Sequence, residues 1–495
     1  MRVHLINPSD VSFGISVVTP RWLYVLASAT PPDVGDPRLV DEALDAFDPA
    51  TVEAGDLVGI GIHTGNALRG YEIGRQARER GAVVVYGGVH STIFPDEVRE
   101  FGHAHAVVKG DGDLVWGTVV RDCAAGQLKD VYEGGRIEGR SFFPGKWSLL
   151  PKEKYMWGSV QTVRGCPKHC SFCSVWRTDG QAPRMRGPAD IIEEIKELRT
   201  HGFKFCLLAD DNFYPVTLKD LEMARRRSDP TTLQNLEAIR RERFELMEML
   251  AELPGEMVFL TQITMEAAED PAFLDAMYKA KIRGVLVGVE SVTPEGLKDI
   301  YKDFNLAGQD LVDRLKVFRE HGVHVLASFI FGLPSDTPAT FDATASVAMS
   351  ADVAFAQFVL LQPFPGTVDF EKWEKEQVNP LKVDDIPVTR HWLIPRNKRP
   401  KIYMPHPSMT PEQIRNHTQA VWDEFYSLPN IWKRAKIVKS LKSRVAFVMV
   451  SKLYRQMYAN TGISTDSARH SKASRMARLL AKPTRRLFVT PVRAS

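Results

Sequence analysis

Three cysteines stand close together in this chain, at Cys166, Cys170 and Cys173. The chain has five cysteines in all, so most of its thiols lie in this one loop. A C-x3-C-x2-C loop brings three thiolates within reach of one inorganic centre. A cubane iron–sulfur cluster has four irons, so three protein thiolates leave one iron open to another ligand. An open coordination position is typical of a catalytic metal centre, whereas structural sites are closed.

Two other interpretations of this loop exist. His169 lies inside it, and one imidazole with three thiolates could close a tetrahedral zinc site. The thiols could also be chance members of a buried turn. The remaining cysteines, Cys123 and Cys206, are isolated in sequence and are interpreted as ordinary buried thiols.

Length and composition indicate a globular protein of two or three domains. The first residues predict a short strand rather than a signal peptide, which needs a longer apolar core. No apolar run reaches the length that spans a bilayer as a helix. Clustered cysteines without a secretion signal predict a cytoplasmic location, where thiols stay reduced.

The first 140 residues alternate short apolar runs with helical periodicity. This alternation predicts a parallel, doubly wound sheet, in which ligands bind at the carboxyl ends of the strands. No G-x-G-x-x-G opens a helix after the first strand, so a dinucleotide site is not indicated. Strands are predicted at residues 3–6, 57–62, 83–86 and 106–108, and a helix at 67–80.

A second alternating region runs from about residue 155 to 375 and predicts a partial (β/α)6 barrel of the TIM type. The first strand, 160–164, leads directly into the cysteine loop. Active sites of such barrels lie at the carboxyl ends of the strands. The predicted helix is 189–201, and the further strands are 205–208, 257–262, 285–289, 325–331 and 358–362. The polar residues 216–247 between them are interpreted as a solvated helical insertion.

Polar and glycine-rich motifs follow these strands. Asp210 and Asp211 are adjacent carboxylates, which are costly at a strand end unless they bind something or face water. A helix-capping role for Asp211 or its neighbour Asn212 is the alternative. Glu290 can accept hydrogen bonds from both hydroxyls of a ribose. Gly332 and Gly366 can place bare backbone beside a flat ligand.

The cysteine loop followed by these strand-end motifs resembles the radical S-adenosylmethionine (SAM) enzymes. The resemblance implies that Cys166, Cys170 and Cys173 bind a [4Fe-4S] cluster, whose fourth iron is chelated by SAM. It places Phe172 and the two glycines near the adenine. The remaining implied SAM contacts are Asp210 and Asp211 at the amino group, and Glu290 and Ser291 near the ribose and methionine.

The first domain is similar to the cobalamin-binding domain of many radical SAM proteins. The similarity lies in Gly87-Gly-Val-His-Ser-Thr, which follows the strand at 83–86, and in the Gly110-Asp-Gly-Asp motif, which follows the strand at 106–108. One departure is that Asn7-Pro-Ser-Asp replaces the D-x-H-x-x-G motif, so no histidine ligand to cobalt is expected from that loop. A sheet that only docks on the barrel is the alternative. The implied cobalamin contacts are Gly87, Gly88, His90, Ser91 and Gly110.

The expected fold is therefore α/β, with a Rossmann-like cobalamin-binding domain (1–145), a radical SAM partial barrel (150–375) and a mainly helical region (376–495). The resemblance implies an enzyme that cleaves SAM, takes a hydrogen atom from an unactivated carbon and methylates that carbon from methylcobalamin. A flavodoxin or ferredoxin would supply the electron. No catalytic side chain is assigned.

Three alternatives to methylation stay open. A radical cyclase, or another C–C or C–H transformation, would use the same cofactors. A methylthiolating tRNA enzyme would need extra cysteines in the first domain, where Cys123 stands alone. A non-catalytic iron–sulfur or cobalamin-binding regulatory module is the alternative from another class.

The last part of the chain is strongly basic. Thr410, Pro411 and Gln413 predict a capped helix over 411–426. Residues 431–495 hold about 16 Lys and Arg against one acid, Asp466, on an otherwise acidic chain. This pattern predicts peripheral docking at the inner face of a membrane, and hence a lipid or other apolar substrate. Nucleic-acid contact and a merely soluble tail are the alternatives.

Overall fold

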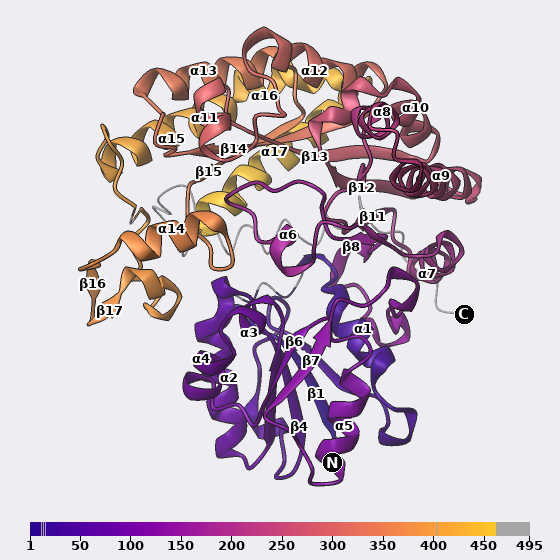
Figure 1. The fold of residues 1–495 in the computed structure, drawn as a ribbon, viewed down its shortest axis with the longest axis vertical. Coiled ribbons are helices and arrows are strands. Elements are labelled where there is room, and N and C mark those ends of the chain that lie inside the picture. Colours follow the sequence, from indigo (N-terminus) through magenta and orange to yellow (C-terminus); the bar gives the residue numbers. More distant parts are fainter. Residues whose placement is uncertain (11, 13, 15, 403, 462–495) are drawn as a thin grey trace.

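The computed structural model describes residues 1–10, 12, 14, 16–402 and 404–461. Two lobes are visible, each built on its own parallel sheet (Figure 1). The α/β class, with a Rossmann-like lobe and a partial barrel, is confirmed. Within the described residues, no helix combines the length and the hydropathy needed to cross a bilayer.

The first lobe is a six-stranded parallel sheet in the order β3-β1-β4-β5-β6-β7. Sequence periodicity predicts four of these strands to within about two residues but misses β3 and β7, in which charged residues or glycine fill about half of the positions. The strands are β1 (Val3–Asn7), β3 (Arg38–Asp41), β4 (Leu57–Gly61), β5 (Val83–Gly87), β6 (Ala106–Gly110) and β7 (Val131–Gly135).

Helices cover both faces of this sheet (Figure 1). Helices α1 (Arg21–Ala29) and α5 (Trp116–Ala124) lie on one face. The other face carries α2 (Ala67–Glu79), α3 (Val89–Ile93) and α4 (Pro95–Phe101). The carboxyl ends of β4, β5 and β6 point toward the second lobe, so their loops face it.

The second lobe is an open barrel sheet in the order β15-β14-β13-β12-β11-β8-β2. Its last member, β2 (Ser16–Val18), comes from the N-terminal part of the chain and pairs in parallel with β8. A strand of three residues is too short to show an alternation of apolar and polar residues, so the sequence does not predict it. The others are β8 (Tyr155–Val160), β11 (Phe205–Leu208), β12 (Val258–Ile263), β13 (Ile282–Glu290), β14 (His324–Phe331) and β15 (Phe355–Leu360).

Helices pack on the convex side of this sheet (Figure 1). Phe329 and Phe358 stack with their rings 5.4 Å apart beneath α13 (Pro338–Ser350). The other outer helices include α7 (Pro188–Thr200), α10 (Pro271–Lys279) and α12 (Gly308–Glu320). The polar insertion is a hairpin of α8 (Leu218–Arg226) and α9 (Pro230–Glu252). Its interpretation as a solvated face holds for residues 230–242 of α9, which are exposed or half buried, and is wrong for the last residues of the predicted range, where Leu246 and Met247 are buried.

The opposite, concave side of the barrel sheet combines half-buried aliphatic side chains with the polar side chains of Gln262, Ser328 and Gln357. Strand residues there alternate with the fully buried positions under the helices. The half-buried set is Leu207, Leu260, Leu286, Leu326 and Val359.

The C-terminal helices close one edge of the barrel. Helix α15 (Pro411–Phe425) begins at the predicted capping box of Thr410 and Gln413, which is confirmed. Trp422 Nε1 donates to the carbonyl of Phe358 at 2.8 Å, so α15 covers the free edge of β15. Helix α16 (Leu428–Arg434) follows, and α17 (Leu441–Thr461) crosses the open barrel, where its Tyr454 contacts Phe355.

Residues 368–399 form a strap between the lobes. The strap contains α14 (Val368–Glu376), the hairpin of β16 (Lys382–Val383) and β17 (Ile386–Pro387), and a short 3-10 helix, Val388–Leu393. Trp392 is fully buried, stacks on Phe94, and donates to Glu97 Oε1 at 2.8 Å. The chain beyond the barrel therefore also packs on the first lobe.

Candidate functional site

The cysteine loop lies between β9 (Val163–Arg164) and α6 (Val175–Thr178), beyond the carboxyl end of β8. Cys170 is buried, whereas Cys166 and Cys173 are half buried. Burial raises the pKa of Cys170 to about 11 and that of Cys173 to about 12. Charge on the neighbouring Cys170 and Cys166 adds to the rise in the pKa of Cys173.

This loop fits a cluster held by three thiolates. A thiolate is unfavourable at such a buried position unless a metal compensates its charge. Metal binding also deprotonates the thiol. His169, the fourth residue of the zinc alternative, is exposed. In the part of the chain that the structure describes, no group of three His, Cys, Asp or Glu side chains could hold a single metal ion.

The two adjacent aspartates after β11 have different surroundings. The Asp210 carboxylate is fully buried and accepts the backbone N–H groups of Thr162 and Val163, at 2.6 and 3.0 Å. It also accepts the Thr162 hydroxyl and faces the buried guanidinium of Arg243 at 3.9 Å. Asp210 therefore stabilises the strand that leads into the cysteine loop, and both of its carboxylate oxygens already accept hydrogen bonds.

Asp211 is the aspartate that remains open to a ligand. It is half buried and accepts the N–H of Gly165, next to Cys166, at 2.7 Å. Burial and the neighbouring charge of Asp179 raise the pKa of Asp211 to about 7. A cationic group bound beside it would favour the ionised carboxylate.

Glu290 ends β13 at a bulge, with a left-handed φ of 66°. Its Oε1 accepts from Nζ of Lys302 at 2.9 Å, and both side chains are buried. A Cβ added to Gly288 would lie 2.2 Å from Glu290 Oε1 and 2.6 Å from Lys302 Nζ, so the pair needs glycine at this position. Lys302 was not predicted, because a lone lysine in a loop gives no sequence signal.

The other predicted SAM contacts lie around the same barrel mouth. Ser291 Oγ accepts the N–H of Thr293 at 3.3 Å, at the start of α11 (Pro294–Asp299). Phe172 packs against the apolar cluster of Ile300, Ile330 and Leu333. Gly332 has a φ of 90°, and its N–H donates to Asp336 at 2.8 Å.

Gly366 brings the first lobe close to the cysteine loop. Its φ is 82°, and an added Cβ would lie 2.8 Å from Ile93 and 3.5 Å from Ser174. Ile93 belongs to α3 of the first lobe, and Ser174 follows Cys173 directly. A side chain at this position would be strained by the positive φ and would crowd the side chain of Ile93.

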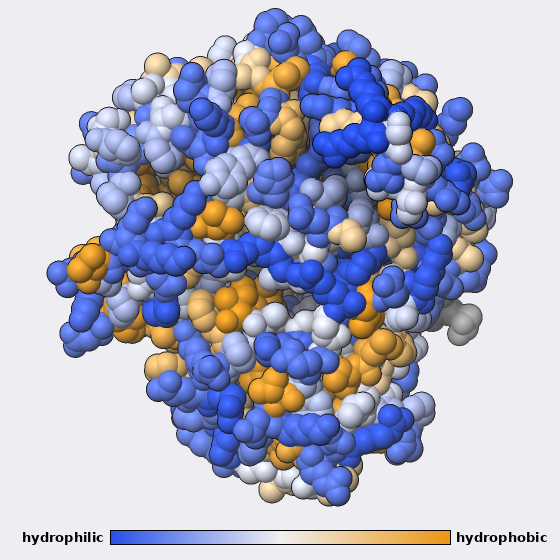
Figure 2. Space-filling view, viewed as in Figure 1, coloured by the Kyte–Doolittle hydropathy of each residue, from blue (hydrophilic) through white to orange (hydrophobic). Residues whose placement is uncertain are grey.

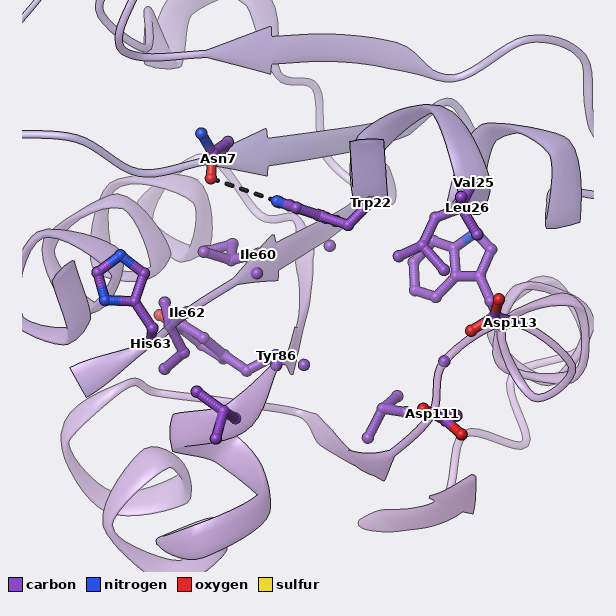
Figure 3. Close-up of a pocket in the computed structure, with 18 of the residues that line it drawn as sticks. Asn7, Trp22, Val25, Leu26, Ile60, Ile62, His63, Tyr86, Asp111 and Asp113 are labelled. Atoms are coloured by element: carbon purple, nitrogen blue, oxygen red, sulfur yellow. Dashed lines mark hydrogen bonds between the residues drawn. The ribbon is translucent and has the colours of Figure 1, made fainter. Parts of the chain in front are cut away.

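A cavity of about 440 Å³ lies where the lobes meet (Figure 3). Its wall is mainly apolar, and the space-filling view shows apolar side chains around the junction of the lobes (Figure 2). Gln161, Arg164 and Ala209 complete it from the barrel side. The principal apolar residues are Trp22, Val25 and Leu26 of α1, Ile60, Ile62 and Tyr86 of the sheet, and Trp116 of α5.

The predicted cobalamin contacts divide into two groups. Gly87, Gly88 and Gly110 line the cavity. His90 and Ser91 do not; His90 is fully buried, and its ring nitrogens bond to Thr64 and Tyr71 at 3.2 and 3.1 Å. The sequence analysis did not single out Trp22 and Trp116, which also line the cavity, because helical aromatic residues give the same signal in an ordinary core.

The Gly110-Asp-Gly-Asp loop also contacts the cysteine loop. Arg164, two residues before Cys166, donates to both carboxylate oxygens of Asp113 at 3.0 Å and to Asp111 at 2.9 Å. All three side chains are largely buried and line the cavity. Both aspartates of the first lobe thus form ion pairs with an arginine of the barrel.

These features define a two-lobed α/β protein in which a three-cysteine loop at the mouth of an open barrel adjoins a cavity in a Rossmann-like sheet. Residues 160–348 match the radical SAM superfamily model. The barrel of this chain therefore carries a radical SAM domain, which implies a [4Fe-4S] cluster and SAM.

Three relatives extend the similarity beyond the barrel. An uncharacterised methyltransferase of Pyrococcus horikoshii is 27% identical over 79% of this chain and 82% of its own. Bacteriochlorophyllide d C-8(2)-methyltransferase of Chlorobaculum tepidum is 26% identical over 71% and 78%. Hopanoid C-2 methylase of Rhodopseudomonas palustris is 26% identical over 72% and 64%.

Two solved structures share the whole fold. The radical SAM methyltransferase TsrM of Kitasatospora setae, with cobalamin and a [4Fe-4S] cluster bound, has a TM-score of 0.65 and 17% identity over 91% of this chain and 99% of its own. The cobalamin-dependent SAM radical enzyme OxsB, with aqua-cobalamin bound, has a TM-score of 0.64 and 11% identity over 98% and 76%. The two-lobed architecture is thus shared with these two enzymes.

Proposed function

We propose that this enzyme uses cobalamin and SAM to methylate an unactivated carbon of an apolar substrate. The observation that carries the proposal is the cavity between the lobes, because its wall includes Arg164 and Ala209, which border the cysteine loop and Asp210. A ligand in this cavity would therefore face the barrel mouth. The cavity is too small for a whole cobalamin but suits an inserted apolar part of one, since ligand pockets of this kind are largely apolar.

The described residues would share the binding of SAM. Cys166, Cys170 and Cys173 would hold the cluster, and Asp211 would accept the amino group of SAM. Glu290 would accept the ribose hydroxyls, while Ser291 keeps the start of α11 in place. When bound, the cluster and SAM supply one-electron chemistry at carbon, and cobalamin supplies a transferable methyl group. Phe172, Gly332 and Gly366 would border the adenine.

The protein itself would hold the cysteine loop in position and exclude water from the barrel mouth. Asp210 holds the strand before the cysteine loop through Thr162 and Val163. The first lobe covers the barrel mouth, and Gly366 allows it to approach closely. Excluding water protects a reactive carbon centre from side reactions. We further propose that a flavodoxin or ferredoxin donates the electron.

The concave barrel face supports an apolar substrate. Five half-buried aliphatic side chains line it, and α17 crosses the open barrel, where Tyr454 and Tyr458 hydrogen-bond to Gln357. Transfer of hydrocarbon surface onto such a face is favourable by roughly 25 cal/mol per Å².

Methyl transfer can be tested by mass spectrometry. We expect reconstituted protein, given cobalamin, a reductant and SAM with a trideuterated methyl group, to label a compound in the lipid and pigment extract of a gene-deletion strain. The product should gain one trideuteromethyl group in place of one hydrogen. Formation of a ring without label would instead support the cyclase alternative, and no 5′-deoxyadenosine at all would contradict the radical assignment.

We also propose that α16 and α17 dock on an anionic membrane surface. Leu441, Val445 and Met449 follow one another along an exposed stripe of α17, with 67%, 48% and 46% of their surface exposed. The lysines around this stripe are exposed too, and they would attract anionic head groups. The lysines are Lys433, Lys436, Lys439 and Lys442. Residues 462–495 of the predicted basic tail lie outside the described residues.

Vesicle flotation tests this docking. Each well-placed lysine adds about 1 kcal/mol of attraction to anionic lipid, so Lys436→Gln with Lys439→Gln should weaken binding roughly 30-fold. Phosphatidylglycerol vesicles should float the wild-type protein, and phosphatidylcholine vesicles should not. Val378→Ser, in the strap and 89% exposed, is the matched control and should bind normally. Equal flotation of all variants would contradict membrane docking.

A further inference from the structure

Lys302 is a buried cation beside the cysteine loop. Its side chain is 9% exposed, and within the described residues its ammonium group makes one hydrogen bond, to Glu290. Its Nζ also lies 5.9 Å from the ring of Phe172, between Cys170 and Cys173 in sequence. A buried ammonium is expensive unless negative charge surrounds it. Among the described residues, Glu290 is the one carboxylate that hydrogen-bonds to this ammonium group, and the neighbouring loop carries three cysteines.

The segment that carries Lys302 is fastened to both sides of the site. On one side, the N–H of Ser171 in the cysteine loop donates to the carbonyl of Ile300 at 3.0 Å. On the other, Asn305 donates to the carbonyl of Gly288 at 3.1 Å. The ammonium is therefore held at a fixed position between the loop and the end of β13.

We propose that Lys302 is the positioned countercharge of the iron–sulfur cluster, and that it raises the reduction potential of the cluster. The inference rests on the proposed cluster at the three cysteines and goes beyond it. Reduction adds one negative charge to a cluster whose thiolates are already anionic. A fixed ammonium nearby favours that added charge, so the electron enters more readily. Glu290 keeps the ammonium in place and partly offsets its field.

Potentiometric titration of the SAM-free cluster, followed by electron paramagnetic resonance, tests this role. Lys302→Met should make one-electron reduction at least tenfold less favourable, which is a shift of about 59 mV to more negative potential. Lys302→Arg keeps the charge and should restore most of the potential. Lys298→Met removes an exposed lysine four residues earlier and should match the wild type.

Glu290→Gln gives an independent measurement if Lys302→Met fails to retain a cluster. It keeps the ammonium, removes its partner, and should move the potential in the positive direction. Unchanged potentials in both variants would overturn the proposal. So would a Lys302→Met protein with the wild-type potential but weakened SAM binding, because the lysine would then serve SAM. A wild-type protein that binds no iron would instead refute the proposed function itself.

Discussion

Cys170→Ala protein should fold but bind no stable [4Fe-4S] cluster and form no 5′-deoxyadenosine from SAM under reducing conditions. Cys170 is the most buried of the three loop cysteines, and no other cysteine lies in the loop to replace it. Two thiolates cannot hold a cubane that also needs one open iron. Iron analysis and the visible absorbance of anaerobically reconstituted protein measure the first effect, and chromatography of the SAM products measures the second.

Cys123→Ala is the matched control for this experiment. Cys123 is half buried in α5 of the first lobe, outside the cysteine loop, so its loss should leave iron content and SAM cleavage unchanged. Turnover by the Cys170→Ala protein would show that the cluster is held elsewhere.

Gly87→Leu should abolish most cobalamin binding while SAM cleavage continues. Gly87 lies at the carboxyl end of β5 and lines the cavity, where an added Cβ would meet nothing nearer than Val108 at 3.9 Å. A leucine there would project into the space that we assign to cobalamin. Overpacking of this kind costs about 1–3 kcal/mol, so we expect affinity to fall roughly 5- to 150-fold in a spectroscopic titration with hydroxocobalamin.

The control adds the same side chain elsewhere in the first lobe. Ala125 is exposed at the end of α5, so Ala125→Leu should bind cobalamin as the wild type does. The cluster content of Gly87→Leu protein should also be normal. Equal cobalamin affinity in both variants would show that the cavity is not the binding site.

Much of this architecture is predictable because its signals are local. Most strands of both sheets are apolar runs, and the carboxyl ends of several coincide with the polar and glycine motifs around the site. The cysteine loop is a contiguous motif, so its identification needs no tertiary information. The capping box of Thr410 and Gln413 at the start of α15 is likewise confirmed, since capping depends on neighbouring residues.

Features that depend on distant residues could not be predicted. The sequence cannot separate Asp210 from Asp211, because only the packed Thr162 and Arg243 show which carboxylate is occupied. The contact of Arg164 with Asp113 joins residues far apart in the chain. Lys302 becomes recognisable as part of the site only once the bulge at Glu290 is seen.

Strand β2 has a consequence for how the protein can be divided. The N–H of Ser16 donates to Lys154 at 2.9 Å, that of Thr19 donates to Trp157 at 3.2 Å, and the Thr19 and Ser159 hydroxyls lie 2.8 Å apart. A truncated chain that began at the barrel would leave the backbone groups along β8 bare, as an aggregation-prone edge. The first lobe thus completes the barrel sheet as well as covering it, and the catalytic barrel is not a separable fragment.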